Sequence, residues 1–283
     1  MMYLFQFTEE ANRLVLERLQ KIGRDIKGAS YERIIDEKIF ELFLSDIEHE
    51  IKFLAVQLAI ARGANIVEER DVKTAFRKLW AELLRKRRNF FVYERYIRED
   101  LDVIKRKVKP SETFWILDAG CGWGRASKWL HRFLGEESEV VGIDLDVFSL
   151  KYGKSLNSDF SFLRVHMSYL PFKPEAFDVI LSSKSFHEIE SENYRRTFYE
   201  FLLSLKLSGL LYVVDSFARF SASKLIQRFL HRMFPKVEVY PQLIEFEMAL
   251  KDSNFRVLKK SYFTTSMLGL NKFCSYIARK VGG

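Results

Sequence analysis

A glycine-rich turn between two apolar segments restricts the fold of this chain more than any other feature. Residues 116–124 read ILDAGCGWG, and residues 140–144 read VVGID. A strand, a glycine turn that opens a helix and a second strand that ends in an acid are typical of nucleotide-like ligand sites. The glycines let the backbone approach the ligand, and Asp144 can accept hydrogen bonds from ribose hydroxyls. The sequence therefore predicts a parallel α/β sheet with a ligand site at its carboxyl edge.

The spacing of the glycines distinguishes two classes of ligand. Dinucleotide sites read G-x-G-x-x-G and place a pyrophosphate at a helix N-terminus. Here Arg125 stands where the third glycine belongs, and Asp118 precedes the turn. An acid beside the turn favours a cationic ligand. A dinucleotide-binding reductase remains a rival hypothesis, which nicotinamide binding would decide.

Four segments in this order resemble the class I S-adenosylmethionine (SAM)-dependent methyltransferases. They are residues 117–124 (LDAGCGWG), 169–172 (YLPF), 176–181 (AFDVIL) and 209–215 (GLLYVVD). The likeness runs from about Ser111 to the C-terminus. It implies a doubly wound, seven-stranded Rossmann-like methyltransferase sheet with SAM as the methyl donor.

Alternating apolar segments and helical patterns place the strands of this sheet. We expect strands near 113–117, 139–143, 161–165, 177–181, 209–214, 255–262 and 273–278. By the resemblance, the last strand is antiparallel and forms a hairpin with its predecessor.

The resemblance also assigns cofactor contacts by position. The turn would line the methionine half of SAM, Asp144 would bind the ribose and Leu145 would pack on adenine. His166 stands where the family usually has a carboxylate or amide, and an unprotonated ring nitrogen could accept from the adenine amino group. The expected cofactor-binding residues are Asp118, Ala119, Gly120, Cys121, Gly122, Gly124, Asp144, Leu145, His166, Met167 and Ser182.

The loop of residues 182–188 (SSKSFHE) is where we expect acceptor chemistry. It contains neither the Asp/Asn-Pro-Pro-aromatic motif nor the Pro-Cys pair with which the family methylates nucleic-acid bases. Methyl transfer first requires that the acceptor atom be aligned with the methyl group of the donor. A base is needed only if the acceptor atom carries a proton. His187 is the candidate base, with Glu188 or Lys184 to orient the acceptor. A packing or helix-capping role for His187 stays open.

Residues 1–79 form a separate helical unit in the sequence. Apolar residues at helical spacing predict a long helix over residues 36–62, with a shorter helix on either side. The pattern resembles an all-α histone fold of the archaeal single-domain kind, which pairs with a second copy. We therefore expect a homodimer through residues 1–79. A plain helical cap over the active site and a DNA-binding histone are the alternatives.

The net charge of +8 is concentrated between the two domains. Residues 80–110 form a basic helical connector with 10 basic and 5 acidic residues, whereas residues 1–79 carry 13 and 14. The run Arg85, Lys86, Arg87 and Arg88 lies beside aromatic residues, which favours weak, non-specific nucleic-acid binding at most. A solvated helix with an aromatic packing stripe explains the same pattern.

The remaining features bear on compartment and substrate. Two cysteines make a disulfide framework or a zinc site unexpected. The N-terminus has no signal-like segment and no stretch is long enough to span a bilayer, so we expect a cytoplasmic protein without an integral membrane segment. Residues 217–234 form a basic amphipathic pattern that predicts a lid, a groove for an apolar acceptor or a membrane-surface contact.

We therefore expect a SAM-dependent methyltransferase in residues 111–283 with an unidentified acceptor. A non-catalytic SAM-binding or DNA-associated regulator that uses the histone-like unit is the alternative.

Overall fold

The chain divides into two compact units, Met1–Ile97 and Arg98–Gly283, which are described separately. The computed structural model describes residues 6–27, 37–108, 114–135, 138–219, 223, 226–228, 232, 240–264 and 271–281. The side chains of residues 80–97, among them Arg85 to Arg88, lie outside the described part. Helix α3 (Glu69–Lys107) begins in the first unit and ends in the second. It therefore includes most of the segment that the sequence analysis treats as a connector.

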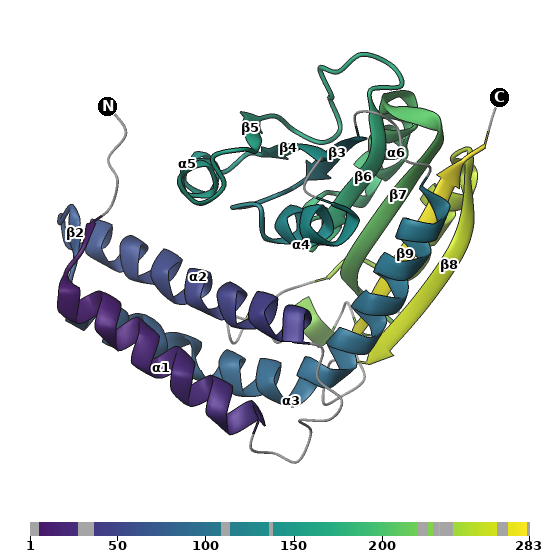
Figure 1. Ribbon diagram of the computed structural model, residues 1–283. Helices are drawn as coiled ribbons and strands as arrows, with labels where there is room; N and C mark the ends of the chain where they lie inside the picture. Colours follow the sequence, from purple (N-terminus) through teal and green to yellow (C-terminus); the bar gives the residue numbers. More distant parts are fainter. Residues whose placement is uncertain are drawn as a thin grey trace. The chain divides into compact units, whose positions relative to one another are not determined.

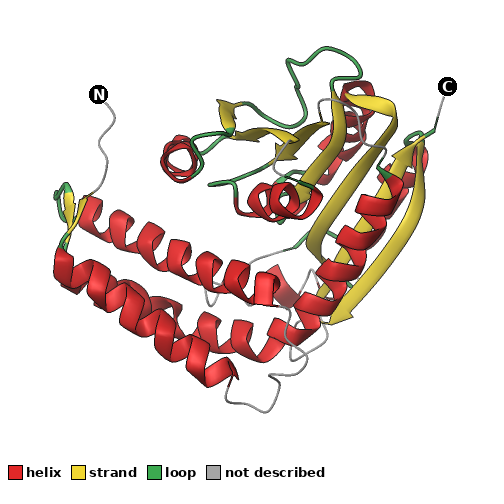
Figure 2. Ribbon diagram, in the orientation of Figure 1, coloured by secondary structure: helices red, strands yellow, loops and turns green. Residues whose placement is uncertain are grey.

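The described residues of the first unit include helices α1 and α2, most of α3 and a short two-stranded sheet (Figures 1 and 2). Besides α3, its elements are β1 (Gln6–Phe7), α1 (Glu9–Lys27), α2 (Glu37–Ala61) and β2 (Ile66–Val67), and β1 pairs with β2 in parallel. The prediction of a long helix over residues 36–62 is confirmed by α2. The prediction of a short helix after it is wrong, because α3 has 39 residues and α2 has 25. No glycine or proline interrupts the α3 sequence, and its first turn is acidic while its last is basic.

The apolar face of α2 is buried within a single chain. Ile47, Ile51, Ala55, Val56 and Ala59 are at most 1% exposed. Burial of these residues therefore does not require a second copy of the chain, and the expected homodimer stays a prediction.

A buried carboxylate fastens the loop between α2 and α3. Asp71 accepts hydrogen bonds from Nε and Nη2 of Arg62, at 3.1 and 2.8 Å, and from the Glu68 backbone N–H at 2.9 Å. Burial raises the pKa of Asp71, but the hydrogen bonds from Arg62 and Glu68 outweigh burial and hold this pKa below its usual value. The charged form of Asp71 therefore stabilises the loop.

The second unit contains a seven-stranded sheet in the order β5-β4-β3-β6-β7-β9-β8 (Figure 1). Its strands are β3 (Phe114–Ala119), β4 (Ser138–Asp144), β5 (Ser161–Arg164), β6 (Phe177–Ser183), β7 (Leu205–Ala218), β8 (Phe255–Thr264) and β9 (Asn271–Lys280). All seven expected strands are present. The expected hairpin is also confirmed, because β9 pairs antiparallel with both β7 and β8, while the other pairings are parallel. The sheet has the predicted Rossmann-like architecture.

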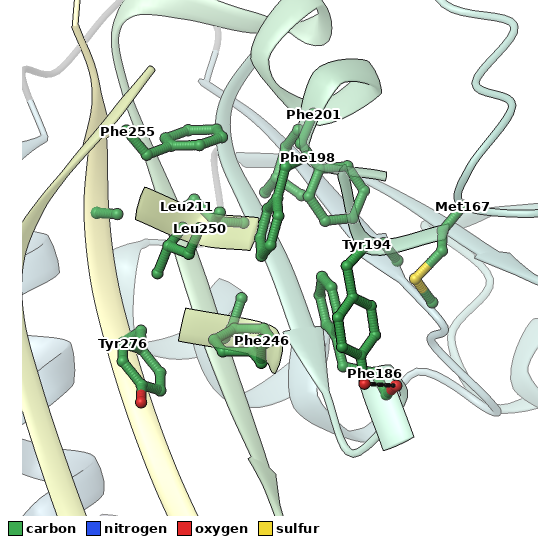
Figure 3. Close-up of a cluster of buried hydrophobic side chains, with 14 of the residues drawn as sticks. Met167, Phe186, Tyr194, Phe198, Phe201, Leu211, Phe246, Leu250, Phe255 and Tyr276 are labelled. Atoms are coloured by element: carbon green, nitrogen blue, oxygen red, sulfur yellow. Dashed lines mark hydrogen bonds between the residues drawn. The ribbon is translucent and has the colours of Figure 1, made fainter. Parts of the chain in front are cut away.

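Helices cover both faces of this sheet (Figure 2). The helices of this unit, besides the end of α3, are α4 (Arg125–Leu134), α5 (Val147–Leu156), α6 (Tyr194–Ser204) and α8 (Leu243–Asp252). On one face, α6 and α8 contribute to an aromatic cluster that includes Phe198, Phe201 and Phe246 (Figure 3). Among the described helices, none is both long and apolar enough to cross a membrane.

The C-terminal part of α3 is attached to the sheet by a buried polar contact. Asp100 is 1% exposed, accepts a hydrogen bond from the Tyr212 hydroxyl at 3.1 Å and lies 2.8 Å from the Lys259 ammonium. These contacts join α3 to β7 and β8. The charge of the buried carboxylate is thereby balanced.

Replacing Asp71 by Asn should loosen the loop between α2 and α3, because charge-assisted hydrogen bonds from Arg62 are lost. We expect a loss of about 1–3 kcal/mol of local stability at pH 7. The native pKa of Asp71 is lowered, so its stabilisation is present above the unfolded value near 3.8 and disappears as pH falls through the native pKa. Hydrogen exchange of peptides over residues 58–72 in the full chain measures the effect. Asn65→Ala, an exposed change in the same loop, is the control, and equal protection in the two variants would contradict this role of Asp71.

Candidate functional site

The glycine turn after β3 exposes its backbone at Gly122. Gly120, Gly122 and Gly124 have φ angles of 78°, 52° and 86°, in the left-handed region that favours glycine. The N–H groups of Gly120 and Cys121 both donate to the Ile143 carbonyl, at 2.8 and 2.9 Å, which fastens the turn to β4. A Cβ added at Gly122 would meet nothing within 4 Å. Space for a ligand therefore lies beside the bare backbone of Gly122.

Asp144 ends β4 and holds this turn. Its Oδ2 accepts a hydrogen bond from the Gly122 N–H at 2.7 Å, and its Oδ1 accepts one from the Asp146 N–H at 2.9 Å. A carboxylate has about four acceptor positions, so both oxygens can take a further donor. Leu145, next in the chain, is 52% exposed. An acceptor group and an apolar surface thus stand side by side at the carboxyl edge of β4.

Asp118 lies beneath the turn and is fully buried. Its Oδ2 accepts hydrogen bonds from the N–H and the hydroxyl of Ser127 in the first turn of α4, at 3.2 and 2.8 Å. Its Oδ1 has no hydrogen-bonding partner among the described residues. Burial, aided by the nearby charge of Asp144, raises the pKa of Asp118 to about 7 despite the hydrogen bonds from Ser127. A cation near this carboxyl group would favour its ionised form.

Two further residues of the turn are buried. Ala119 is fully buried, and Cys121 is 7% exposed with its thiol donating to the Gly122 carbonyl at 3.3 Å. Burial raises the pKa of the Cys121 thiol well above its usual value. Cys121 therefore remains a thiol and supports the turn by packing.

Three of the expected cofactor-binding residues, His166, Met167 and Ser182, lie outside the glycine turn. Nδ1 of His166 accepts a hydrogen bond from the Ser168 N–H at 3.1 Å, so a neutral His166 carries its proton on Nε2. The role of His166 in cofactor binding stays a prediction, and in this arrangement Nε2 of a neutral ring would donate to the cofactor rather than accept from it. Met167 belongs to the aromatic cluster (Figure 3), and its Cε lies 3.0 Å from a Cβ built on Gly120. Ser182 is fully buried, and its hydroxyl has no partner in the described part of the chain.

The loop after β6 is fastened directly to the glycine turn. The Ser185 hydroxyl donates to the Gly120 carbonyl at 2.8 Å, and the Lys184 N–H donates to the Val214 carbonyl of β7 at 2.8 Å. Lys184 has a φ of 58°, which turns the chain sharply at this point. The loop that carries His187 therefore lies beside the turn that faces the ligand space.

His187 forms a pair with a buried carboxylate. Its Nδ1 lies 2.7 Å from Oδ1 of Asp215, and its backbone N–H donates to Oδ2 of Asp215 at 3.1 Å. Asp215 is 1% exposed, whereas the side chains of Lys184 and Glu188 are exposed. The sequence analysis includes Asp215 in the segment 209–215 but assigns it no role. In the structure Asp215 lies near the carboxyl end of β7 (Leu205–Ala218), the strand next to β6.

Two expectations concern other parts of the site. The predicted lid over residues 217–234 lies mostly outside the described residues. Within the described part of the chain, no group of three His, Cys, Asp or Glu side chains is arranged to hold a metal ion.

Comparison with known proteins identifies the fold of this unit. Residues 116–209 match a family model described as "Methyltransferase domain". This match includes the glycine turn, Asp144 and the loop with His187. None of the curated proteins compared with the chain matches its sequence.

Solved structures share the fold at low sequence identity. Geranyl diphosphate C-methyltransferase from Streptomyces coelicolor A3(2), solved with Mg²⁺, geranyl-S-thiolodiphosphate and S-adenosyl-L-homocysteine, aligns with a TM-score of 0.53 and 16% identity over 65% of this chain and 76% of that chain. The YcgJ protein from Bacillus subtilis aligns with a TM-score of 0.50 and 14% identity over 66% of this chain and all of its own. The [4+2]-cyclase SpnF aligns with a TM-score of 0.52 and 17% identity over 65% and 81%. The fold of this unit is therefore that of the methyltransferases, and one of these three proteins is named as a cyclase.

Alanine at Gly120 and at Gly122 should have different effects on stability. A Cβ at Gly120 would lie 2.3 Å from Oγ and 2.4 Å from Cβ of Ser185, whereas a Cβ at Gly122 meets open space. We expect Gly122→Ala to cost about 1–2 kcal/mol, the strain of a left-handed alanine. Gly120→Ala should cost about 1–3 kcal/mol more, because the loop with His187 must move. Urea unfolding measures both variants.

Adding Ser185→Gly to Gly120→Ala removes the overlapping atoms and should restore part of the stability that Gly120→Ala loses. Equal stability of the two single variants would show that Ser185 does not pack on the turn as described.

Proposed function

We propose that this chain is a SAM-dependent methyltransferase that binds its cofactor at the glycine turn and Asp144. The observation that carries this proposal is the bare backbone of Gly122, which faces open space and is held by a carboxylate with remaining acceptor positions. The match of residues 116–209 to the methyltransferase domain model supports it.

The residues present fit the chemistry of SAM. The unpartnered Oδ1 of Asp118 lies in a buried position where a cationic ligand would supply the missing positive charge. Asp144 would accept from the ribose hydroxyls, and the exposed Leu145 would pack on the adenine ring. Bound SAM supplies an electrophilic methyl group on a sulfonium.

Acceptor activation would come from the loop after β6. His187 lies on this loop, and its pairing with Asp215 supports a role as general base. Lys184 and Glu188, both exposed, are the candidates to orient the acceptor. In the rival proposal, a non-catalytic SAM-binding regulator, the His187–Asp215 pair has only a structural role.

Replacing Asp144 by Ala should weaken SAM binding by roughly 1.5–3 kcal/mol, the range for hydrogen bonds to a charged group. Calorimetry with SAM and with its demethylated product measures this loss. Asp159→Ala, an exposed change near the start of β5, is the control. Absence of SAM binding by the wild type, or unchanged affinity in Asp144→Ala, would disprove the proposed cofactor site.

We also propose that the N-terminal unit mediates homodimerisation, in keeping with its histone-like sequence pattern. A groove of about 450 Å³ between α1 and α2 supports this proposal. Its lining includes Leu16, Leu19 and Leu44, and Leu16 is 55% exposed. An exposed apolar side chain in a groove is typical of association surfaces.

Replacing Leu16 by Glu should dissociate such a dimer without unfolding the chain, because this side chain is exposed in the single chain. Sedimentation at micromolar concentration measures the mass. The control is Arg13→Glu, a change on the same helix where the arginine side chain is already 73% exposed. A wild type that sediments as a monomer would disprove the dimer and favour a cap role for the helical unit.

A further inference from the structure

We propose that Asp215 is a positioning residue that prepares His187 to take a proton from a hydroxyl group, and that the methyl acceptor is a phenol or an enol. The proposal rests on the methyl-transfer function proposed above. It names the acceptor class and a residue to which the sequence analysis assigns no role.

The Asp215 carboxylate is oriented by its surroundings before any acceptor binds. Oδ1 accepts from the Ser216 N–H at 2.6 Å and lies 2.7 Å from Nδ1 of His187, while Oδ2 accepts from the His187 N–H at 3.1 Å. A carboxylate at this distance accepts a hydrogen bond, so the imidazole proton resides on Nδ1. The basic lone pair of a neutral His187 is then on Nε2.

The backbone of His187 is held from the opposite side by the aromatic cluster. Phe186, fully buried, stacks on Phe198 with ring centroids 5.3 Å apart. The Tyr194 hydroxyl donates to the Phe186 carbonyl at 3.2 Å, the contact dashed in Figure 3. The ring of Tyr240 lies 5.4 Å from the His187 ring. The position of the imidazole is thus supported by packing around Phe186, by the nearby Tyr240 ring and by the contact with Asp215.

The position of this pair relates it to the proposed cofactor site. Ser185, two residues before His187, donates to the carbonyl of Gly120 in the glycine turn. A base fastened to that turn can reach an acceptor aligned with the donor methyl group.

The proposed step balances in protons and electrons. A lone pair of the acceptor oxygen forms the new bond to the methyl carbon, and the electrons of the carbon–sulfur bond return to sulfur, which becomes neutral. The acceptor proton passes to Nε2 of His187. The resulting imidazolium is stabilised by the Asp215 carboxylate, and its proton is later released to water.

The chemistry of the pair selects the acceptor class. A thioether or a tertiary amine has no proton to lose, so a base would contribute nothing. A carboxylic acid is already ionised near pH 7. An ammonium group would gain most from direct contact with a carboxylate, but Asp215 is 1% exposed and about three of its four acceptor positions are taken by His187 and Ser216.

Among hydroxyl groups, one of phenolic acidity fits this pair best. A tyrosine-like hydroxyl has a pKa near 10, within about 3.5 units of an ordinary imidazole. Proton transfer across such a gap is within the reach of general base catalysis. Simple alcohols are far less acidic.

The first experiment is independent of turnover. Nitrogen NMR of the full chain, labelled at histidine and bound to S-adenosyl-L-homocysteine, reports which ring nitrogen of His187 carries the proton, with His187→Gln used to assign the signal. We expect the Nδ1–H form in the wild type. Asp215→Asn should shift His187 toward the Nε2–H form, because the amide can donate to Nδ1. A wild-type Nε2–H form, or no shift in Asp215→Asn, would overturn the proposal.

The second experiment identifies the acceptor atom. The full chain transfers radiolabelled methyl groups from SAM into a protein-free metabolite extract, and mass spectrometry identifies the labelled products. We expect methyl groups on phenolic or enolic oxygen. Asp215→Asn should lower kcat roughly 10²- to 10⁴-fold with SAM affinity unchanged. Asp252→Asn, an exposed change on α8, is the control.

The outcomes separate this inference from the proposed function. Label on sulfur or on a tertiary amine, or an unchanged kcat in Asp215→Asn, would overturn the inference while methyl transfer stands. Absence of SAM binding in calorimetry, or of label in any product, would instead overturn the proposed function.

Discussion

The contact between the Ser185 hydroxyl and the Gly120 carbonyl joins the two halves of the candidate site. One half is the glycine turn that faces the proposed cofactor, and the other is the loop that carries His187. The contact requires glycine at position 120, since any Cβ there would overlap Ser185. The left-handed conformation of the turn and the position of the candidate base therefore depend on the same few atoms. A movement of the loop would therefore displace both the glycine turn and His187.

Three carboxylates near the carboxyl ends of β3, β4 and β7 have different roles because their surroundings differ. Asp118 is fully buried, and this burial raises its pKa to about 7. Asp144 accepts from two backbone N–H groups and keeps acceptor positions for a ligand. Asp215 is buried but turned toward an imidazole. Parallel strands bring acids to one edge of the sheet, and local hydrogen bonding decides whether an acid supports the fold, binds a ligand or orients a base.

The sheet could be predicted almost completely from the sequence, whereas the helical unit could not. Alternating apolar segments mark all seven strands, and the antiparallel β9 follows from the likeness to methyltransferases. The sequence predicts helix on both sides of residue 80 but not its continuity, because the change in charge there suggests a boundary although no glycine or proline interrupts α3. Burial of Ile51 within one chain was also missed, because helical periodicity shows which face is apolar but not what covers it.

The sequence by itself determined the architecture of residues 114–280, the glycine turn and the identity of the acid after β4, since these depend on local order and spacing. Only the tertiary structure decided which side chains meet. Asp215 is 28 residues from His187, and Ser185 is 65 residues from Gly120. The contact between the Ser168 N–H and Nδ1 of His166 is likewise visible only in the fold. Pairings across strand ends depend on sheet order and loop conformation, and no periodicity along the chain encodes them.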